Sequence, residues 1–206
     1  MTFPDKAFEN IHVFADAYFD QLAIASQSVD AKALNEAALM LGNAYDRRAA
    51  VYVCGNGGSA SIANHLICDH LKGLQTDTNT RPRVMSLSSN IEILTAIAND
   101  VSYEDIFTFQ LSTMADAGDV LITISSSGES ENIVRAAQWA KSNKCSVIAM
   151  TGFDGGRSSK LAHINLHVES DNYGVIEDTH QSLMHILAQF LRLDRMENSL
   201  IPERRF

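Results

Sequence analysis

The feature that most constrains the fold of this 206-residue chain is a regular alternation, from residue 50 onward, of short apolar runs with longer amphipathic stretches. The apolar runs occupy residues 50–54, 84–87, 119–124, 146–150 and 164–168. Strands that are apolar on both faces are typical of parallel sheets covered by helices on both sides. We therefore predict an α/β fold, a three-layer αβα sandwich around a five-stranded parallel sheet.

Apolar residues at helical spacing fill the segments between these runs. The predicted helices span residues 59–72, 91–98, 103–114, 130–142 and 174–197. Two further helices precede the first strand, one over residues 5–27 and one that begins after Asp30, a residue type that caps helices. Two helices are more than the sheet needs there, so we expect their apolar faces to pack against a partner subunit. The predicted organisation is an arm of residues 1–47, a domain of residues 48–199 and a tail of residues 200–206.

The composition argues against several classes of function. The formal net charge is -9 and no dense basic stretch occurs before the tail, which argues against nucleic-acid binding. No apolar run approaches the roughly 20 residues of a membrane span, and the first residues lack the pattern of a signal peptide. Cys54, Cys68 and Cys145 show no CxxC spacing, so we expect free thiols in a cytoplasmic protein.

Two loops that follow predicted strands carry groups that bind anions. The first is Gly55-Asn56-Gly57-Gly58-Ser59, where glycines allow close backbone approach and Ser59 can cap the next helix. The second, residues 125–130, has the sequence SSSGES and offers four hydroxyls. Either loop alone is more simply explained as a solvated turn with a capping residue. Together, at equivalent ends of two strands of one sheet, they favour a phosphate site that uses neutral donors and helix N-termini.

Two predicted helices carry a histidine and a carboxylate each. His65 and Asp69 are four residues apart and share a helix face, and Glu177 and His185 do so at a spacing of eight. These four side chains can bind a divalent ion, or they can transfer protons beside a sugar carbon. Metal identity stays open, because such ligands suit zinc but also nickel, manganese or iron.

Other candidates have simpler explanations. Structural or surface roles are expected for His12, His70, His163 and His167, whereas His180 stays undecided. Lys72, Asp100 and Gln181 can each belong to the site, yet surface or capping roles explain them equally well.

Several of these motifs occur together, in the same order, in a known family. The chain carries CGNGGSA at residues 54–60, LTAIAND at 94–100, SSSGES at 125–130 and MTGFDGG at 150–156. From about residue 30 to residue 198 it resembles the SIS (sugar isomerase) domain family, in particular its phosphoheptose isomerase branch. The resemblance implies a flavodoxin-like sheet with a helical N-terminal arm, assembled as a homotetramer with active sites at subunit interfaces. It also implies isomerisation of sedoheptulose 7-phosphate to D-glycero-D-manno-heptose 7-phosphate, by enzymes that often hold zinc.

The resemblance assigns roles to individual residues of this chain. The implied phosphate ligands are Ser125, Ser126, Ser127 and Ser130. The implied sugar contacts are Asn56, Gly57, Ser59, Asn90 and Glu177. The implied metal ligands are His65, Asp69, Glu177 and His185, of which Asp69 and His185 are also the catalytic acid–base pair.

The chain departs from the pattern of the family at three of these positions. The family usually has Glu, Gln and Asp where this chain has Asp69, Glu177 and Asn90. Asp reaches about one methylene less far than Glu, and a misplacement on the order of 1 Å can cost about 10²-fold in rate. An isomerase acting through an enediol is the interpretation we favour. The alternatives are a non-catalytic binding protein similar to the DnaA initiator-associating protein and a phosphosugar sensor. The two histidines and two carboxylates that the chain keeps argue against the former.

Overall fold

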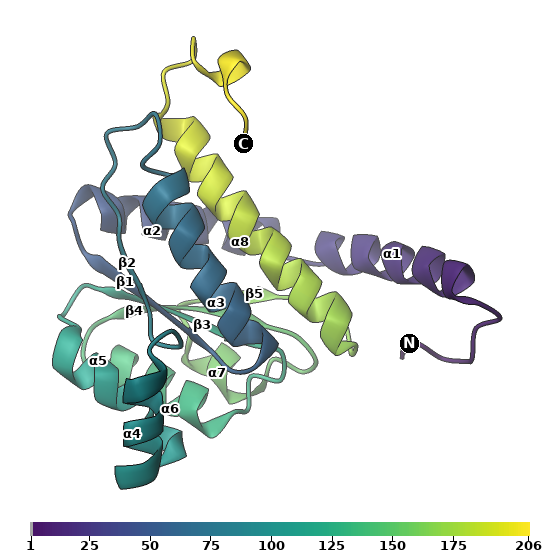
Figure 1. Ribbon diagram of the computed structural model, residues 1–206, viewed down its shortest axis with the longest axis horizontal. Coiled ribbons are helices and arrows are strands. Elements are labelled where there is room, and N and C mark those ends of the chain that lie inside the picture. The colour runs from purple at the N-terminus through teal and green to yellow at the C-terminus, as the bar shows by residue number, and fades with distance from the viewer. Residues whose placement is uncertain (1) are drawn as a thin grey trace.

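The computed structural model describes residues 2–206 and confirms the α/β prediction (Figure 1). Five strands form one parallel sheet in the order β2-β1-β3-β4-β5. Their bounds are β1 Ala50–Gly55, β2 Arg83–Ser86, β3 Val120–Ser125, β4 Ser146–Thr151 and β5 Ile164–His167. Each predicted strand is present within one or two residues at either end, and the strand order is that of flavodoxin-like folds.

Helices cover both faces of the sheet. One face packs against α2 (Ala31–Asp46), α3 (Gly58–Cys68) and α8 (Tyr173–Arg195). The other face packs against α4 (Ile91–Asp100), α5 (Thr108–Met114) and α6 (Glu131–Ser142), with the short α7 (Gly156–Leu161) beside them. Alternate residues of a strand point to opposite faces, so Val51 and Val53 enter the first core while Tyr52 and Cys54 enter the second.

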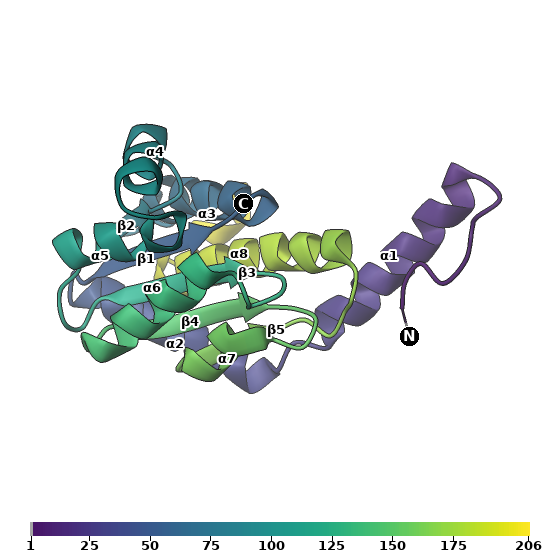
Figure 2. The ribbon, with the colours of Figure 1, turned by 90° about the horizontal axis from the view of Figure 1, so that it is seen from below.

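The N-terminal arm differs from the prediction at its start. The first helix, α1, spans Ile11–Gln27 rather than beginning at residue 5. Asn10 ends the preceding segment, because its side chain accepts hydrogen bonds from the N–H groups of His12 and Val13. The residues before it fold back along α1, where the ring of Phe3 stacks on that of Phe14 with centroids 5.8 Å apart. Figure 2 shows α1 projecting away from the three layers.

Other elements refine the expectations. Asp30 caps α2 as predicted, accepting a hydrogen bond from Lys32 N–H. The predicted helix 59–72 is continuous in space, but its last turn, Asp69–Gly73, is a π-helix in which Leu74 N–H donates to Asp69 O. Two 3-10 turns, Tyr103–Asp105 and Ile201–Glu203, complete the elements.

Candidate active site

The two predicted loops lie next to each other at the carboxyl ends of β1 and β3. These strands are neighbours, and the order of the sheet reverses there, which is where ligands of such folds bind. A cavity of about 240 Å³ opens between the loops. Its lining residues are Asn56, Gly57, Gly58, Ser59, Ile124, Ser125, Ser126, Ser127, Ser130, Tyr173 and Glu177. The structure thus brings the four predicted phosphate serines and the glycine loop into one cavity.

The glycine loop approaches α8 closely. Gly57 has a φ of 53° and precedes the first turn of α3. At Gly58, an added Cβ would overlap the carboxylate of Glu177. The N–H groups of the first turn of α3 and the Glu177 side chain therefore border the same small space.

The serine loop supplies hydroxyls in a buried setting. Ser125 and Ser126 are buried, and the Ser126 hydroxyl has no hydrogen-bond partner among residues 2–206. Gly128, at a φ of 64°, lets this loop lie against the loop before α7, because a side chain there would overlap Gly155 O. A buried hydroxyl without a partner suits a ligand that brings an acceptor oxygen.

A second group of side chains lies where α3 ends and α8 passes beside it (Figure 1). Nδ1 of His185 is 2.7 Å from Oδ2 of Asp69, and Nε2 of His65 lies 3.5 Å from Oδ1 of Asp69. The amide nitrogen of Gln181 lies 3.0 Å from Nδ1 of His65 and 2.9 Å from Nε2 of His185. The four residues therefore form a closed ring of polar contacts.

The ring has a consistent set of hydrogen-bond directions when both imidazoles are neutral. An amide nitrogen has two N–H groups and no acceptor, so Gln181 donates to one nitrogen of each histidine. His185 then carries its proton on Nδ1 and donates it to Asp69, whose carboxylate only accepts. In this arrangement each of the three hydrogen bonds pairs a donor with an acceptor.

The ring also has the donor set of a metal site. The ligand atoms of His65, Asp69 and His185 all lie within 4.8 Å of one another. Two imidazoles and one carboxylate are a common set for zinc and other borderline divalent ions. These residues fit such an ion. It would bind imidazole nitrogens that here accept hydrogen bonds from Gln181, together with the Asp69 carboxylate.

Glu177 was predicted as a fourth metal ligand, but its side chain lies away from the other three. It is not a member of the His65–Asp69–His185 group and instead lines the serine cavity beside Gly58. One turn of helix separates it from Gln181, which stands between the two histidines. Burial, and then the charge of Asp178, raise the pKa of the Glu177 carboxyl above its usual range.

Most of the other candidates have structural roles. Asn90 is exposed, caps α4 by accepting from Ile93 N–H, and is not among the residues that line the cavity. Asp100 is exposed at the end of α4, where it accepts from Asn99. Lys72 lies on the π-helix beside Asp69, in a separate pocket.

The remaining histidines do not reach the cavity. His180 is fully buried, its Nε2 donates to Thr151 O, and burial lowers its pKa to about 4. His70 is also fully buried, bonds to the hydroxyl of Tyr45 and has a pKa lowered to about 4 by burial. His163 and His167 bond to groups of β4, and His12 is exposed.

Three residues that the sequence did not single out belong to this region. Tyr173 lines the cavity at the first turn of α8. Asn132 and Tyr103 hydrogen-bond the side chain of Asn56. The only signal for Asn132 was its place in the first turn after the serine loop, and nothing local marked Tyr103.

Comparisons with known proteins find relatives that cover most of the chain. The family model described as "SIS domain" matches residues 17–152. A phosphoheptose isomerase from Colwellia psychrerythraea is 34% identical over 186 residues, covering 89% of this chain and 92% of that protein. One from Helicobacter hepaticus is 36% identical over 166 residues, covering 81% of this chain and 84% of its own.

Solved structures give the same result. A phosphoheptose isomerase from Neisseria gonorrhoeae aligns with a TM-score of 0.80 and 26% identity over 88% of this chain and 98% of its own. One from Francisella tularensis aligns with a TM-score of 0.81 and 27% identity, over 88% of this chain and 96% of its own. The chain therefore belongs to the SIS domain family.

Proposed function

We propose that this protein is a phosphoheptose isomerase, which interconverts sedoheptulose 7-phosphate and D-glycero-D-manno-heptose 7-phosphate. The observation that carries the proposal is the Asp69–His185 pair, 2.7 Å apart, at the end of α3 and midway along α8, the two helices whose first turns line the cavity between the anion-binding loops. Curated relatives with this activity in their names cover nine-tenths of the chain at 34% identity. An aldose–ketose isomerase needs such a pair, because it moves one proton between adjacent carbons and another between their oxygens.

The two loops divide the work of holding the substrate. Ser125, Ser126, Ser127 and Ser130 bind the phosphate with hydroxyls and with N–H groups at the start of α6. Asn56, Gly57 and Ser59 face the sugar, where the absence of a side chain at Gly57 lets it lie against the backbone. Glu177 accepts hydrogen bonds from sugar hydroxyls at the opposite wall. The acidic chain thus binds its anion without bulk positive charge.

The acid–base steps are assigned from the ring. Asp69 is the base that removes the proton from the carbon next to the carbonyl, which leaves an enediolate, and it returns a proton to the neighbouring carbon to complete the isomerisation. His185, hydrogen-bonded to Asp69, exchanges protons with the two sugar oxygens. An N–H of Asn56 stabilises the negative charge that develops on one of those oxygens.

His65, Asp69 and His185 would also hold a divalent ion, with zinc the proposed metal. Such an ion supplies Lewis-acid polarisation of the sugar carbonyl.

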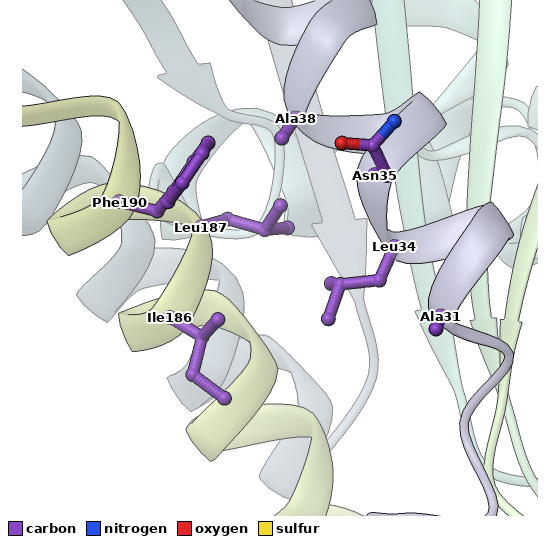
Figure 3. A pocket seen from close by; sticks show the side chains of 7 residues that line it. All are labelled: Ala31, Leu34, Asn35, Ala38, Ile186, Leu187 and Phe190. Atoms are coloured by element: carbon purple, nitrogen blue, oxygen red, sulfur yellow. The ribbon is translucent and has the colours of Figure 1, made fainter. Parts of the chain in front are cut away.

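The proposal includes a homotetramer whose sites lie at subunit interfaces. Its support is a groove of about 220 Å³ between α2 and α8, lined by Ala31, Leu34, Asn35, Ala38, Ile186, Leu187 and Phe190 (Figure 3). Ile186 and Phe190 are about half exposed, as are several large apolar residues of α1. An apolar surface of this kind on α1, α2 and α8 is suited to burial between subunits.

The proposed location is the cytoplasm. Its support is that Cys54, Cys68 and Cys145 are all unpaired, as reduced thiols are in that compartment. Among residues 2–206, no helix combines the length and the apolarity that crossing a bilayer requires.

The test is isomerisation of sedoheptulose 7-phosphate in deuterated water with a divalent metal present. We expect conversion to the aldose phosphate with deuterium entering at the carbon next to the carbonyl, and we expect Asp69→Asn to abolish both. The variant His12→Gln, which changes an exposed histidine of α1, is the matched control and should behave as wild type. Neither conversion nor exchange by the wild-type protein would refute the proposal.

A further inference from the structure

Asn56, which faces the sugar in the proposed function, is held by a second amide from the helix after the serine loop. Nδ2 of Asn56 donates to Oδ1 of Asn132 at 2.9 Å, and Nδ2 of Asn132 donates back to Oδ1 of Asn56 at 3.0 Å. Asn132 is only 1% exposed and does not line the cavity. The two loops that border the cavity are therefore joined by a reciprocal pair of amides.

A backbone group fixes the direction of this pair. Two amides that exchange hydrogen bonds could, taken alone, both be turned over without loss. The N–H of Ile133 removes that freedom, because it donates to Oδ1 of Asn132 at 2.9 Å and a backbone N–H can only donate. Oδ1 of Asn132 must then face Ile133, its Nδ2 must face Asn56, and the oxygen of Asn56 must face Asn132.

The hydroxyl of Tyr103 reinforces the same orientation. It donates to Oδ1 of Asn56 at 3.2 Å, so that this oxygen accepts two hydrogen bonds. An amide oxygen has two lone pairs, and both are thus engaged. The nitrogen of Asn56 uses one N–H for Asn132, and its second N–H has no partner among residues 2–206.

We propose that Asn132 is a positioning residue that, oriented by the first turn of α6, makes Asn56 present a single N–H donor to the cavity. This inference rests on the proposed isomerase function. A preset donor suits an oxygen that becomes negative during the reaction, since it needs no reorientation as charge develops. The oxygen of Asn56, occupied twice, cannot accept from a sugar hydroxyl. The hydroxyl of Tyr103, on an exposed side chain, favours the same orientation of Asn56 by donating to its oxygen.

Three substitutions distinguish a change in the orientation of the Asn56 amide from the simple loss of its contact with Asn132. Asn132→Leu removes the pair and leaves Asn56 free to rotate. Asn132→Asp keeps the shape but offers only acceptors, so it draws the nitrogen of Asn56 toward itself and turns the oxygen to the cavity. Tyr103→Phe removes one hydroxyl from a side chain that is 56% exposed, so this variant should fold as wild type does.

The experiment measures kcat and KM for sedoheptulose 7-phosphate with each variant, in the wild-type background and in Asn56→Ala. We expect kcat to fall about 3-fold for Tyr103→Phe, about 10-fold for Asn132→Leu and about 10²-fold for Asn132→Asp, with KM within about 2-fold. In the Asn56→Ala background all three changes should lose their effect, because the residues act through Asn56.

Gln110→Met is the matched control for loss of a buried amide. Gln110 is 7% exposed and donates to Leu87 O and Ile106 O, so its replacement should lower the melting temperature and leave kcat unchanged. Equal kcat for the Leu and Asp variants at position 132, or undiminished effects in Asn56→Ala, would overturn the inference. An inactive wild-type protein would instead refute the proposed function, so the two failures are distinguishable.

Discussion

At the scale of single residues, Asp69 combines two tasks, since its carboxylate holds both histidines and is also the proposed base. Replacing it with Asn keeps the shape but removes the charge and the basicity. We expect Asp69→Asn to lower kcat at least about 10²-fold, the usual contribution of a general base. Deuterium exchange measures the loss directly. Asp77→Asn is the control, because Asp77 pairs with Arg192 and Arg204 and its loss should affect the melting temperature alone.

The buried His180 makes a prediction about stability. Its pKa is about 4 in the folded protein, against about 6.5 for a free histidine, so the unfolded chain binds the proton more tightly. Stability contributed by the neutral ring is therefore present above pH 6.5 and is lost as pH falls toward 4, by on the order of 3 kcal/mol.

Urea unfolding between pH 4 and pH 7.5 measures this dependence. His180→Gln should reduce the slope of unfolding free energy against pH to about half, because the buried His70 also has a pKa of about 4 and keeps its share. His12→Gln, at an exposed position, should leave the slope unchanged. An unaltered slope in His180→Gln would contradict the prediction.

The sequence predicted, from helical spacing, a cluster of His65, Asp69, Glu177 and His185, three of which, His65, Asp69 and His185, lie together in the structure. It did not predict the position of Gln181 between the rings, which depends on how α8 crosses α3. Nor did it indicate Asn132, whose role exists only because two loops distant in sequence end at neighbouring strands. Such contacts follow from tertiary packing, which local patterns do not encode.

At the scale of elements, α7 is tied to the serine loop by one arginine. Arg157 lies 2.7 Å from the Glu129 carboxylate and 2.9 Å from that of Glu131, and it donates to Glu129 O. Its guanidinium holds the pKa of both carboxyls below their usual range. The loop that we propose to bind the phosphate is thereby braced from outside.

We expect Arg157→Ala to raise KM about two- to five-fold with kcat unchanged, as an exposed ion pair warrants. Added salt should raise the KM of the wild type toward that of the variant, because it screens the pair. Arg135→Ala removes another arginine that pairs with Glu131 and leaves the Glu129 contact, so it serves as the control. A KM that is unchanged in Arg157→Ala would show that the brace is dispensable.

Helices and strands were predictable where their sequences carried a continuous apolar run, a helical apolar periodicity or a capping residue. The strands were found because buried strands are continuously apolar, and α2 because Asp30 caps it. Helix α7 was missed, since GRSSKL begins at the second of two glycines and has no apolar face long enough to indicate a helix. The π-helical turn that begins at Asp69 depends on how the chain leaves α3, and no residue type in the sequence indicates it.

At the scale of the whole molecule, the apolar groove between α2 and α8 predicts association (Figure 3). Replacing Phe190 with Glu puts a charge on a surface that we propose to be buried in the homotetramer, so the complex should dissociate. Light scattering after size-exclusion chromatography should show a mass near four chains for the wild type and a smaller mass for Phe190→Glu.

Glu92→Lys, on the exposed start of α4 away from this groove, is the control for a change of charge and should keep the wild-type mass. If the sites lie at subunit interfaces, Phe190→Glu should also lose activity in parallel with its mass. A monomeric wild type that is fully active would contradict both statements.

The arrangement of the whole chain was predictable as far as the layers, because alternation of strands and helices requires a parallel sheet. The direction of α1 was not, since its path depends on the fold-back of residues 2–9 and on the hydrogen bond from Tyr18 to Asp178.

The close approach of Gly58 to Glu177 has an evolutionary consequence. A methyl group at position 58 would overlap the Glu177 carboxylate where it now lies, so the end of that side chain would have to move, and we expect the two positions to vary together. In related sequences we expect glycine at 58 wherever 177 carries a long side chain, and a short residue at 177 wherever 58 has gained even a methyl group. The residue at either position taken alone does not reveal this constraint. Paired changes at positions 58 and 177 across sequences that share an ancestor would reveal it.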